Sequence, residues 1–175
     1  KPGKVSYASS GSGGGPHIAA EMFERAAGIE LLHVPYKGGG PAAADVMAGH
    51  VDMYFATVLE SIGSVKTGKL RGLAVSSLAK SPALSELPTI AEAALPGFDT
   101  SSWIGMVAPA GTPNAIVDQI SNDIRGALND PDVKKTLIGQ GATPLAMSPS
   151  LLKARIESDR QRYAKVIKDA NITMQ

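Results

Sequence analysis

The feature that most constrains the fold is an order of strand, loop and helix that occurs twice before residue 50. The stretch "VSYASSGSGGGPHIAAEMF" has an apolar start at 5–8 and a glycine-rich loop. Pro16 then stands where a helix would begin, a position at which its missing N–H leaves no bond unmade. The stretch "ELLHVPYKGGGPAAADVMAG" repeats the order, with a strand expected at 31–34, a loop at 35–40 and a helix at 41–48. Two successive units of this kind predict parallel strands joined by helical crossovers.

The same pattern continues to residue 77. "VDMYFAT" at 51–57 predicts a third strand, 58–68 a helix ended by Gly68, and "LRGLAVSS" at 70–77 a fourth strand. The proline-rich stretch 81–98 predicts a surface connection with one short helix. "TSSWIGMVAPAG" at 100–111 is an extended apolar run, which we expect to be a crossing strand between two lobes.

The remaining residues predict helices with no substantial sheet of their own. Thr112 is the expected cap of a first helix, a second runs from about 130 to Gly139, and a third begins at a Ser148 cap; only 143–147 could form a strand. The first of these helices carries an apolar stripe made of Ile116, Val117, Ile120, Ile124 and Leu128. Such helices must cover another surface, either the first lobe or a lobe whose strands lie elsewhere.

Composition excludes several kinds of site. The formal charge of +1 does not suggest a nucleic-acid-binding surface, and the absence of cysteine removes disulfides, thiolate nucleophiles and thiolate metal sites. The three histidines fall in different expected elements without metal-ligand spacing, and no G-x-S-x-G or H-E-x-x-H motif occurs. No base is placed beside Ser10 or Ser12. We therefore expect no metal, no cofactor, no catalytic residue and no enzymatic activity.

The first glycine loop does not match a nucleotide site. The third glycine of a G-x-G-x-x-G fingerprint would fall at position 16, which is proline, and the second strand closes with His33, Val34 and Pro35 rather than with an acid. No Gly-Lys-Ser/Thr sequence follows, as a Walker loop requires. A smaller anion remains as the candidate ligand.

The loop chemistry favours a carboxylate. Glycines allow backbone N–H groups to approach a ligand, serine hydroxyls add donors, and the following helix directs its positive end at the loop. In an open parallel sheet the loops at the carboxyl ends of neighbouring strands border one crevice. The predicted ligand-binding residues are Ser10, Gly11, Ser12, Gly13, Tyr36, Lys37, Gly38, Ala56 and Thr57. The alternative is that these loops are tight connections that bind nothing.

Four further residues have simpler expected roles. His17 lies in the first turn of its expected helix, where capping or packing is favoured over contact with a ligand. Glu21 and Glu24 are expected to be acids on the helix surface. Trp103, the one tryptophan of the chain, is expected in core or hinge packing.

The order of motifs along the chain resembles a known family. "YASSGSGGGPHIAAEMF", "LLHVPYKGGGPAAADVMAGHVDMYF", "LPTIAEAALPGF", "SWIGMVAPAGTP" and "LNDPDVKKTLIGQGATPLAMSP" follow one another as in the Bug, or TctC-like, extracytoplasmic solute receptors of tripartite tricarboxylate transporters. The combination of "HVPYKG", "PTIAEA" and "APAGTP" is specific, and the similarity covers nearly the whole chain.

The resemblance implies a periplasmic-binding-protein-like α/β fold of type II, with two lobes that close on a small carboxylate. It assigns residues 1–103 to the ligand-binding second lobe, and 104–175 to a crossing strand and helices that belong to a first lobe whose N-terminal part is missing. It also implies a periplasmic location and permease subunits as partners. Exposed C-terminal helices could then support a homo-oligomer.

Two rival functions share this lobe architecture. One is the effector-binding domain of a transcription regulator, which would need a helix-turn-helix upstream. The other is a small-molecule enzyme, in which Ser10 or Ser12 would act as the nucleophile.

Overall fold

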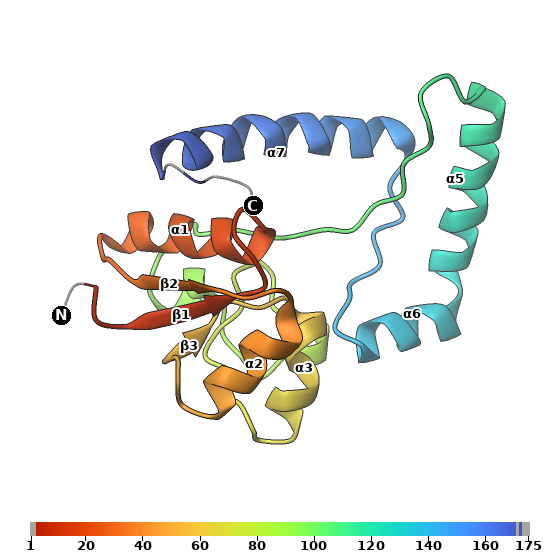
Figure 1. Ribbon diagram of the computed structural model, residues 1–175. Coiled ribbons are helices and arrows are strands. Elements are labelled where there is room, and N and C mark those ends of the chain that lie inside the picture. Colours follow the sequence, from red (N-terminus) through yellow and green to blue (C-terminus); the bar gives the residue numbers. More distant parts are fainter. Residues whose placement is uncertain (1–2, 171, 173–175) are drawn as a thin grey trace.

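A computed structural model describes residues 3–170 and 172, and its centre is a parallel three-stranded sheet (Figure 1). The strands β1 (Ser6–Ser9), β2 (Leu32–Pro35) and β3 (Met53–Tyr54) lie in the order β2-β1-β3. Tyr7 of the central strand pairs with His33 on one side and Met53 on the other. The predicted parallel arrangement and the α/β class are confirmed.

Helices cover both faces of this sheet. α1 (Gly15–Ala27) lies on one face, and α2 (Gly39–Met47) lies on the other with α3 (Val58–Lys66) beside it (Figure 1). α1 begins with Pro16 in its first turn and ends at Gly28, whose φ of 64° is the left-handed conformation that glycine adopts at little cost. α3 begins with a capping box formed by Thr57 and Glu60.

Small side chains bring β1 and α2 into close contact. Ala8 of β1 packs against Ala42 of α2 and against Val51, and Tyr7 is fully buried on the neighbouring position. Because successive side chains of a strand point to opposite faces, Tyr7 faces α1 while Ala8 faces α2. The core therefore fixes the carboxyl end of β1, where the glycine-rich loop starts.

The predicted fourth strand at 70–77 is wrong. In this stretch the structure has one isolated parallel bridge, between Val75 and Thr89. The ladder cannot extend because Pro88 lacks an N–H and Thr89 caps a helix. The connection that follows contains a 3-10 turn, η1 (Pro82–Leu84), and the short α4 (Ile90–Ala93).

Within residues 3–170 and 172, the expected crossing strand at 100–111 pairs with no other strand. This segment runs as an irregular chain from beside α1 to α5 (Asn114–Asn129), which α6 (Pro131–Gly139) follows (Figure 1). Pro113, not Thr112, is the N-cap of α5, because the Thr112 hydroxyl donates instead to the Pro109 carbonyl at 2.8 Å. The possible strand at 143–147 is also irregular.

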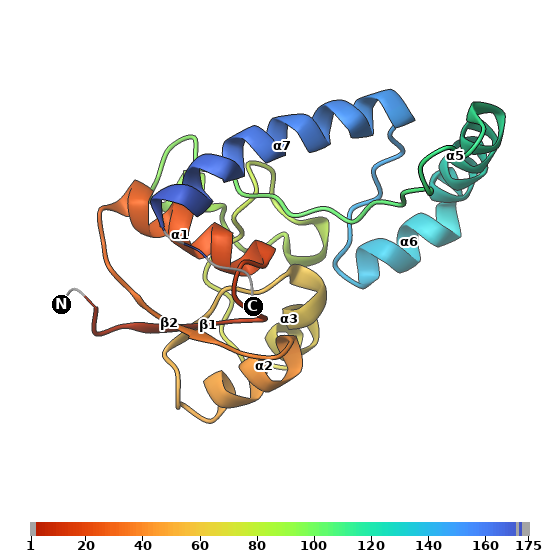
Figure 2. The ribbon, with the colours of Figure 1, turned by 45° about the horizontal axis from the view of Figure 1, so that its top comes forward.

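The last helix packs against α1, one of the helices that cover the sheet. α7 (Pro149–Asp169) begins at the predicted Ser148 cap and lies along α1 in both views (Figures 1 and 2). Arg25 of α1 forms an ion pair with Asp169 at 3.6 Å. α5 instead packs against α6, away from the sheet, and its predicted apolar stripe is exposed at Ile116 and Ile120. Among the described residues, none of the helices is both long and apolar enough for a membrane span.

Candidate functional site

The structure brings the three predicted loops together at the carboxyl edge of the sheet. The Tyr36 amide donates to the Ser9 carbonyl at 3.0 Å, and the Gly38 amide donates to the Ser10 carbonyl at 3.2 Å. On the other side of β1, the Phe55 amide donates to the Ala8 carbonyl at 3.1 Å. These bonds fix the loops after β2 and β3 against the loop after β1, as the sequence predicted from the topology.

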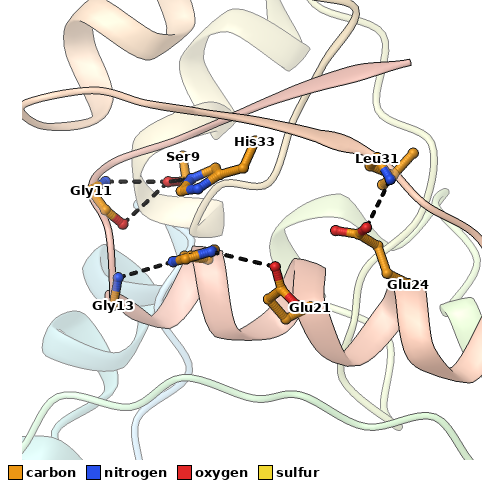
Figure 3. A network of polar contacts seen from close by, with 8 residues as sticks. Ser9, Gly11, Gly13, Glu21, Glu24, Leu31 and His33 are labelled. Carbon is orange, nitrogen blue, oxygen red and sulfur yellow. Dashed lines mark hydrogen bonds and ion pairs between the residues drawn. The ribbon is translucent and has the colours of Figure 1, made fainter. Parts of the chain in front are cut away.

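Several of the expected donors are already used within the protein. The Gly11 amide lies 3.4 Å from Ser9 Oγ, and the Gly13 amide donates to His17 Nδ1 at 3.0 Å (Figure 3). The Tyr36 hydroxyl donates to Asp45 Oδ2 at 2.7 Å, and the Gly38 amide is paired as described above. The binding roles expected of Gly11, Gly13, Tyr36 and Gly38 therefore stay predictions, because these donors have partners within the protein. The side chains of Ser9 and His17 accept the hydrogen bonds of the Gly11 and Gly13 amides. The spacing of these residues in the sequence does not show this.

The donors that remain in the first loop belong to two serines. Across residues 3–170 and 172, the amides and hydroxyls of Ser10 and Ser12 donate no hydrogen bond to another residue. Lys37 in the second loop has an exposed side chain. A small anion at this edge would thus meet the two serines, with the lysine at its margin.

At the corner after β3, the polar groups of Thr57 already have partners within the protein. Ala56 has no polar side-chain atom, and both the Thr57 amide and hydroxyl donate to Glu60 Oε2, at 3.1 and 3.0 Å. Tyr54 lies against the same carboxylate, and burial together with the charge of Glu60 raises its pKa to about 12. The capping box that starts α3 therefore occupies the polar groups of this corner.

A pair of histidines holds the glycine loop through contacts with Ser9 and Gly13. Ser9 Oγ lies 2.7 Å from His33 Nε2, and the His33 ring stacks on His17. Because the Gly13 amide donates to His17 Nδ1, the ring proton of neutral His17 is on Nε2, which faces Glu21 at 3.6 Å. Burial lowers the pKa of both imidazoles. Of the two roles expected for His17, packing is confirmed, because the residue is 7% exposed and stacks on His33.

Glu24 is more than the expected surface acid. Its Oε2 accepts the Leu31 amide at 2.8 Å, which ties α1 to the residue before β2 (Figure 3). Burial raises the pKa of Glu24. No local sequence pattern indicates this contact, because Glu24 lies in α1 and Leu31 in the connection that follows it.

A cavity of about 410 Å³ adjoins the edge of the sheet. It lies between the start of α1, the corner after β3, the segment before the exposed chain at 104–107, and the middle of α7. The residues that line it are Gly15, Pro16, Ile18, Ala19, Ala56, Thr57, Ser76, Thr100, Ser101, Ser102, Trp103, Ile156, Asp159, Arg160 and Tyr163. Of the predicted site residues, Ala56 and Thr57 line this cavity. Thr100 and its neighbours were not among the predicted site residues, although the run "TSSW" places three hydroxyls beside the tryptophan.

Trp103 is fixed at the wall of the cavity by a buried carboxylate. Its indole N–H donates to Asp159 Oδ2 at 2.7 Å, and Arg155 Nε donates to the same oxygen at 2.8 Å. Burial of Asp159 raises its pKa, but the hydrogen bonds from Arg155 and Trp103 outweigh that effect, so the pKa is lowered overall. Trp103 is half-buried and lines the cavity, so its expected role in core or hinge packing stays a prediction.

The family model described as "Tripartite tricarboxylate transporter family receptor", TctC, matches residues 1–172. The chain belongs to this family. A UPF0065 protein in the tcbD-tcbE intergenic region of Pseudomonas sp. (strain P51) is 41% identical over 167 residues, covering 95% of this chain and 50% of that protein. The resemblance drawn from the motifs is confirmed.

Two solved structures show how well the fold is shared. The structure described as R. palustris Rpa4515 with adipate has a TM-score of 0.87 and 34% identity, over 99% of this chain and 58% of that one. MatC (Rpa3494) from Rhodopseudomonas palustris, with bound malate, has a TM-score of 0.79 and 25% identity, over 94% and 57%. The chain thus spans little more than half the length of these proteins.

Proposed function

We propose that this chain is the ligand-binding part of an extracytoplasmic receptor that captures a small carboxylate. The observation that carries the proposal is the pair Ser10 and Ser12, whose donors stand at the carboxyl edge of a parallel sheet, where ligands bind in open α/β folds. Family membership supports the proposal, and so do the dicarboxylates in the names of the two similar structures, adipate and malate.

The two serines and the adjacent helix end would hold one carboxylate group. Hydrogen bonds to a charged group contribute about 1.5–3 kcal/mol each. The N-cap of α1 is Gly14, which has no side chain to cap the helix, so the positive end of the helix adds roughly 0.3–1 kcal/mol at an exposed position. Micromolar affinity requires about 8 kcal/mol net, after association has cost roughly 4–15 kcal/mol in lost freedom of motion, so these loops need a second set of contacts. A second lobe that touches the ligand only when closed would supply them.

The lobe boundaries are part of the same proposal. We assign residues 1–103 to the ligand-binding lobe and the arm formed by α5 and α6 to the surface that meets the other lobe. The exposed apolar residues of the arm and of the preceding segment support this, since Ile104 is 93% and Val107 85% exposed. α7 lies against α1, and this contact does not support placing the last helix in the other lobe.

We further propose that the receptor works in the periplasm with the permease subunits of a tripartite tricarboxylate transporter, as its family name suggests. The receptor would carry the ligand to the membrane, and the permease would move it across. No cofactor or catalytic step enters this scheme, because binding and release alone perform it.

An NMR titration tests the carboxylate site. We expect adipate and malate at millimolar concentration to shift the backbone amide signals of Ser10 and Ser12 more than those of the paired Gly13 and Gly38. A Ser10→Ala, Ser12→Ala double variant should weaken binding about tenfold or more, because each lost hydroxyl contact contributes on the order of 1 kcal/mol. Ser85→Ala, at an exposed position away from the sheet edge, is the matched control. Shifts that avoid this loop, or none at all, would refute the proposal.

A further inference from the structure

The cavity under α7 begins where the carboxylate site ends. Gly15 and Pro16 line it, and they directly follow the loop that holds Ser10 and Ser12. Ala56 and Thr57 bring the third loop of the sheet edge to the same cavity. A ligand whose carboxylate lies at the loop therefore has this space beside it.

Most of the cavity wall is apolar. Ile18 and Ala19 of α1 face Ile156 and Tyr163 of α7, and Trp103 closes one side. The volume of about 410 Å³ lies in the range of roughly 300–1,000 Å³ that is typical of small-molecule sites. Such walls favour the carbon chain or ring of a ligand.

In the part of the chain that the structure describes, one buried hydroxyl of the wall has no hydrogen-bond partner. Thr100 is 6% exposed, and its Oγ1 makes no hydrogen bond to any described residue. By contrast, the hydroxyls of Ser76 and Ser101 donate to the Thr100 carbonyl and to Asp99 Oδ1. A buried hydroxyl without a partner is costly, so a polar atom of a ligand would satisfy it.

The two charged residues of the wall are already paired. Asp159 accepts from Trp103 and Arg155, and Arg160 donates two hydrogen bonds to Glu157. The cavity thus offers no free charge to a densely charged ligand such as a tricarboxylate.

We infer that this cavity receives the apolar body of the ligand, so that the receptor selects carboxylates with an extended carbon chain or a ring and with a polar group that reaches Thr100. The inference rests on the proposed carboxylate site and adds the class of acid that the site prefers. Each methylene transferred into an apolar wall improves affinity about fourfold. Chain length is then the main determinant of affinity.

A chain-length series on the unmodified protein tests the inference. Succinate and adipate share two carboxylates and differ by two methylenes, so we expect adipate to bind about fifteenfold more tightly. Citrate should bind more weakly than adipate. Trp103 is the single tryptophan of the chain, so its fluorescence reports occupation of the cavity directly. Adipate should change the emission, and succinate should change it less.

Two variants locate the effect. Ala19→Leu fills the cavity and should abolish the preference for adipate over succinate, while Thr100→Val should weaken adipate binding severalfold. Ala115→Leu and Thr136→Val, at exposed positions of α5 and α6, are the matched controls and should change neither. If succinate and adipate bind equally and leave Trp103 unchanged, the inference fails while the carboxylate site stands. If no carboxylate shifts Ser10 or Ser12, the proposed function itself fails.

Discussion

The imidazole rings of His17 and His33 stack with their centroids 3.8 Å apart, and the glycine loop is anchored to both of them. The ring of Tyr7 stacks on the other side of His33 at 4.8 Å. Burial, together with the charge that His17 would carry, lowers the pKa of His33 to about 4. Both rings are therefore neutral near pH 7, and protonation of either would place a charge inside the support of the binding loop.

We expect the free energy of unfolding to fall as the pH drops from about 6.5 to about 4. In that window His33 binds a proton in the unfolded state but not in the folded state, so the lower pH stabilises the unfolded state relative to the folded one. The loss is on the order of 2 kcal/mol, since each pKa unit corresponds to about 1.4 kcal/mol and partial exposure reduces the effect. Urea unfolding at several pH values measures it, and His33→Gln should flatten the dependence.

The control for this prediction is His50→Gln, because the His50 side chain is 70% exposed. Glu21 and Glu24 act in the opposite direction. Burial raises the pKa of both, so the folded state takes up their protons more readily as the pH falls. The comparison of variants isolates the histidine. Equal pH dependence in the unmodified protein and in His33→Gln would contradict the assignment.

The sequence predicted the units that local physics determines. Pro16 and Gly28 delimit α1 because one needs no N–H and the other adopts a left-handed φ, and the same logic places Ser148 before α7. Three parallel strands followed from the repeated loop and helix order. The loops then met at one edge because parallel topology requires it.

What the sequence could not show depends on partners far along the chain. The apolar run at 70–77 has the composition of a strand but forms a single bridge, between Val75 and Thr89, and Pro88 ends the pairing because it lacks an N–H. The glycine loop lost its expected free amides to His17 and to the Ser10 carbonyl, contacts that only the folded chain defines. The cavity beside Trp103 combines α1 with α7, and no local pattern joins those two segments.

Asp159 should be the most sensitive position of α7. Asp159→Ala leaves the Trp103 indole N–H and the Arg155 guanidinium without their shared acceptor, and the residue is 7% exposed. We expect a loss of about 2–3 kcal/mol in unfolding free energy, less than for a fully buried pair because Arg155 is partly exposed. Glu157→Ala, on the exposed face of the same helix, should cost much less, because solvent screens its ion pair with Arg160. Denaturant unfolding followed by Trp103 fluorescence measures the unfolding free energy of both variants. Equal losses for Asp159→Ala and Glu157→Ala would contradict the prediction.

Gly141 should tolerate no side chain. Its φ is 88°, and a Cβ there would lie 2.7 Å from Val58 Cγ1 and 3.1 Å from the Val58 carbonyl carbon. Gly141→Ala is expected to lower stability by more than about 1 kcal/mol, through backbone strain and displacement of the start of α3. Gly139→Ala, two residues earlier in α6, meets no atom within 4 Å and should be neutral or slightly stabilising. Thermal unfolding of the pair tests the claim, and similar melting temperatures would count against it.

The exposed apolar side chains of the arm and of the segment before it should make this chain associate with itself. Ile104 and Val107 are 93% and 85% exposed, and Ile116 and Ile120 of α5 are 48% and 43% exposed. Patches of this kind are rare on monomers and mark interfaces. We expect sedimentation velocity to show association that increases with concentration, and Ile104→Lys with Val107→Lys to reduce it. Gln119→Lys, which adds charge to α5 without removing an apolar side chain, is the control. A compact monomer at all concentrations, with no binding of an apolar dye, would show that this surface needs no partner.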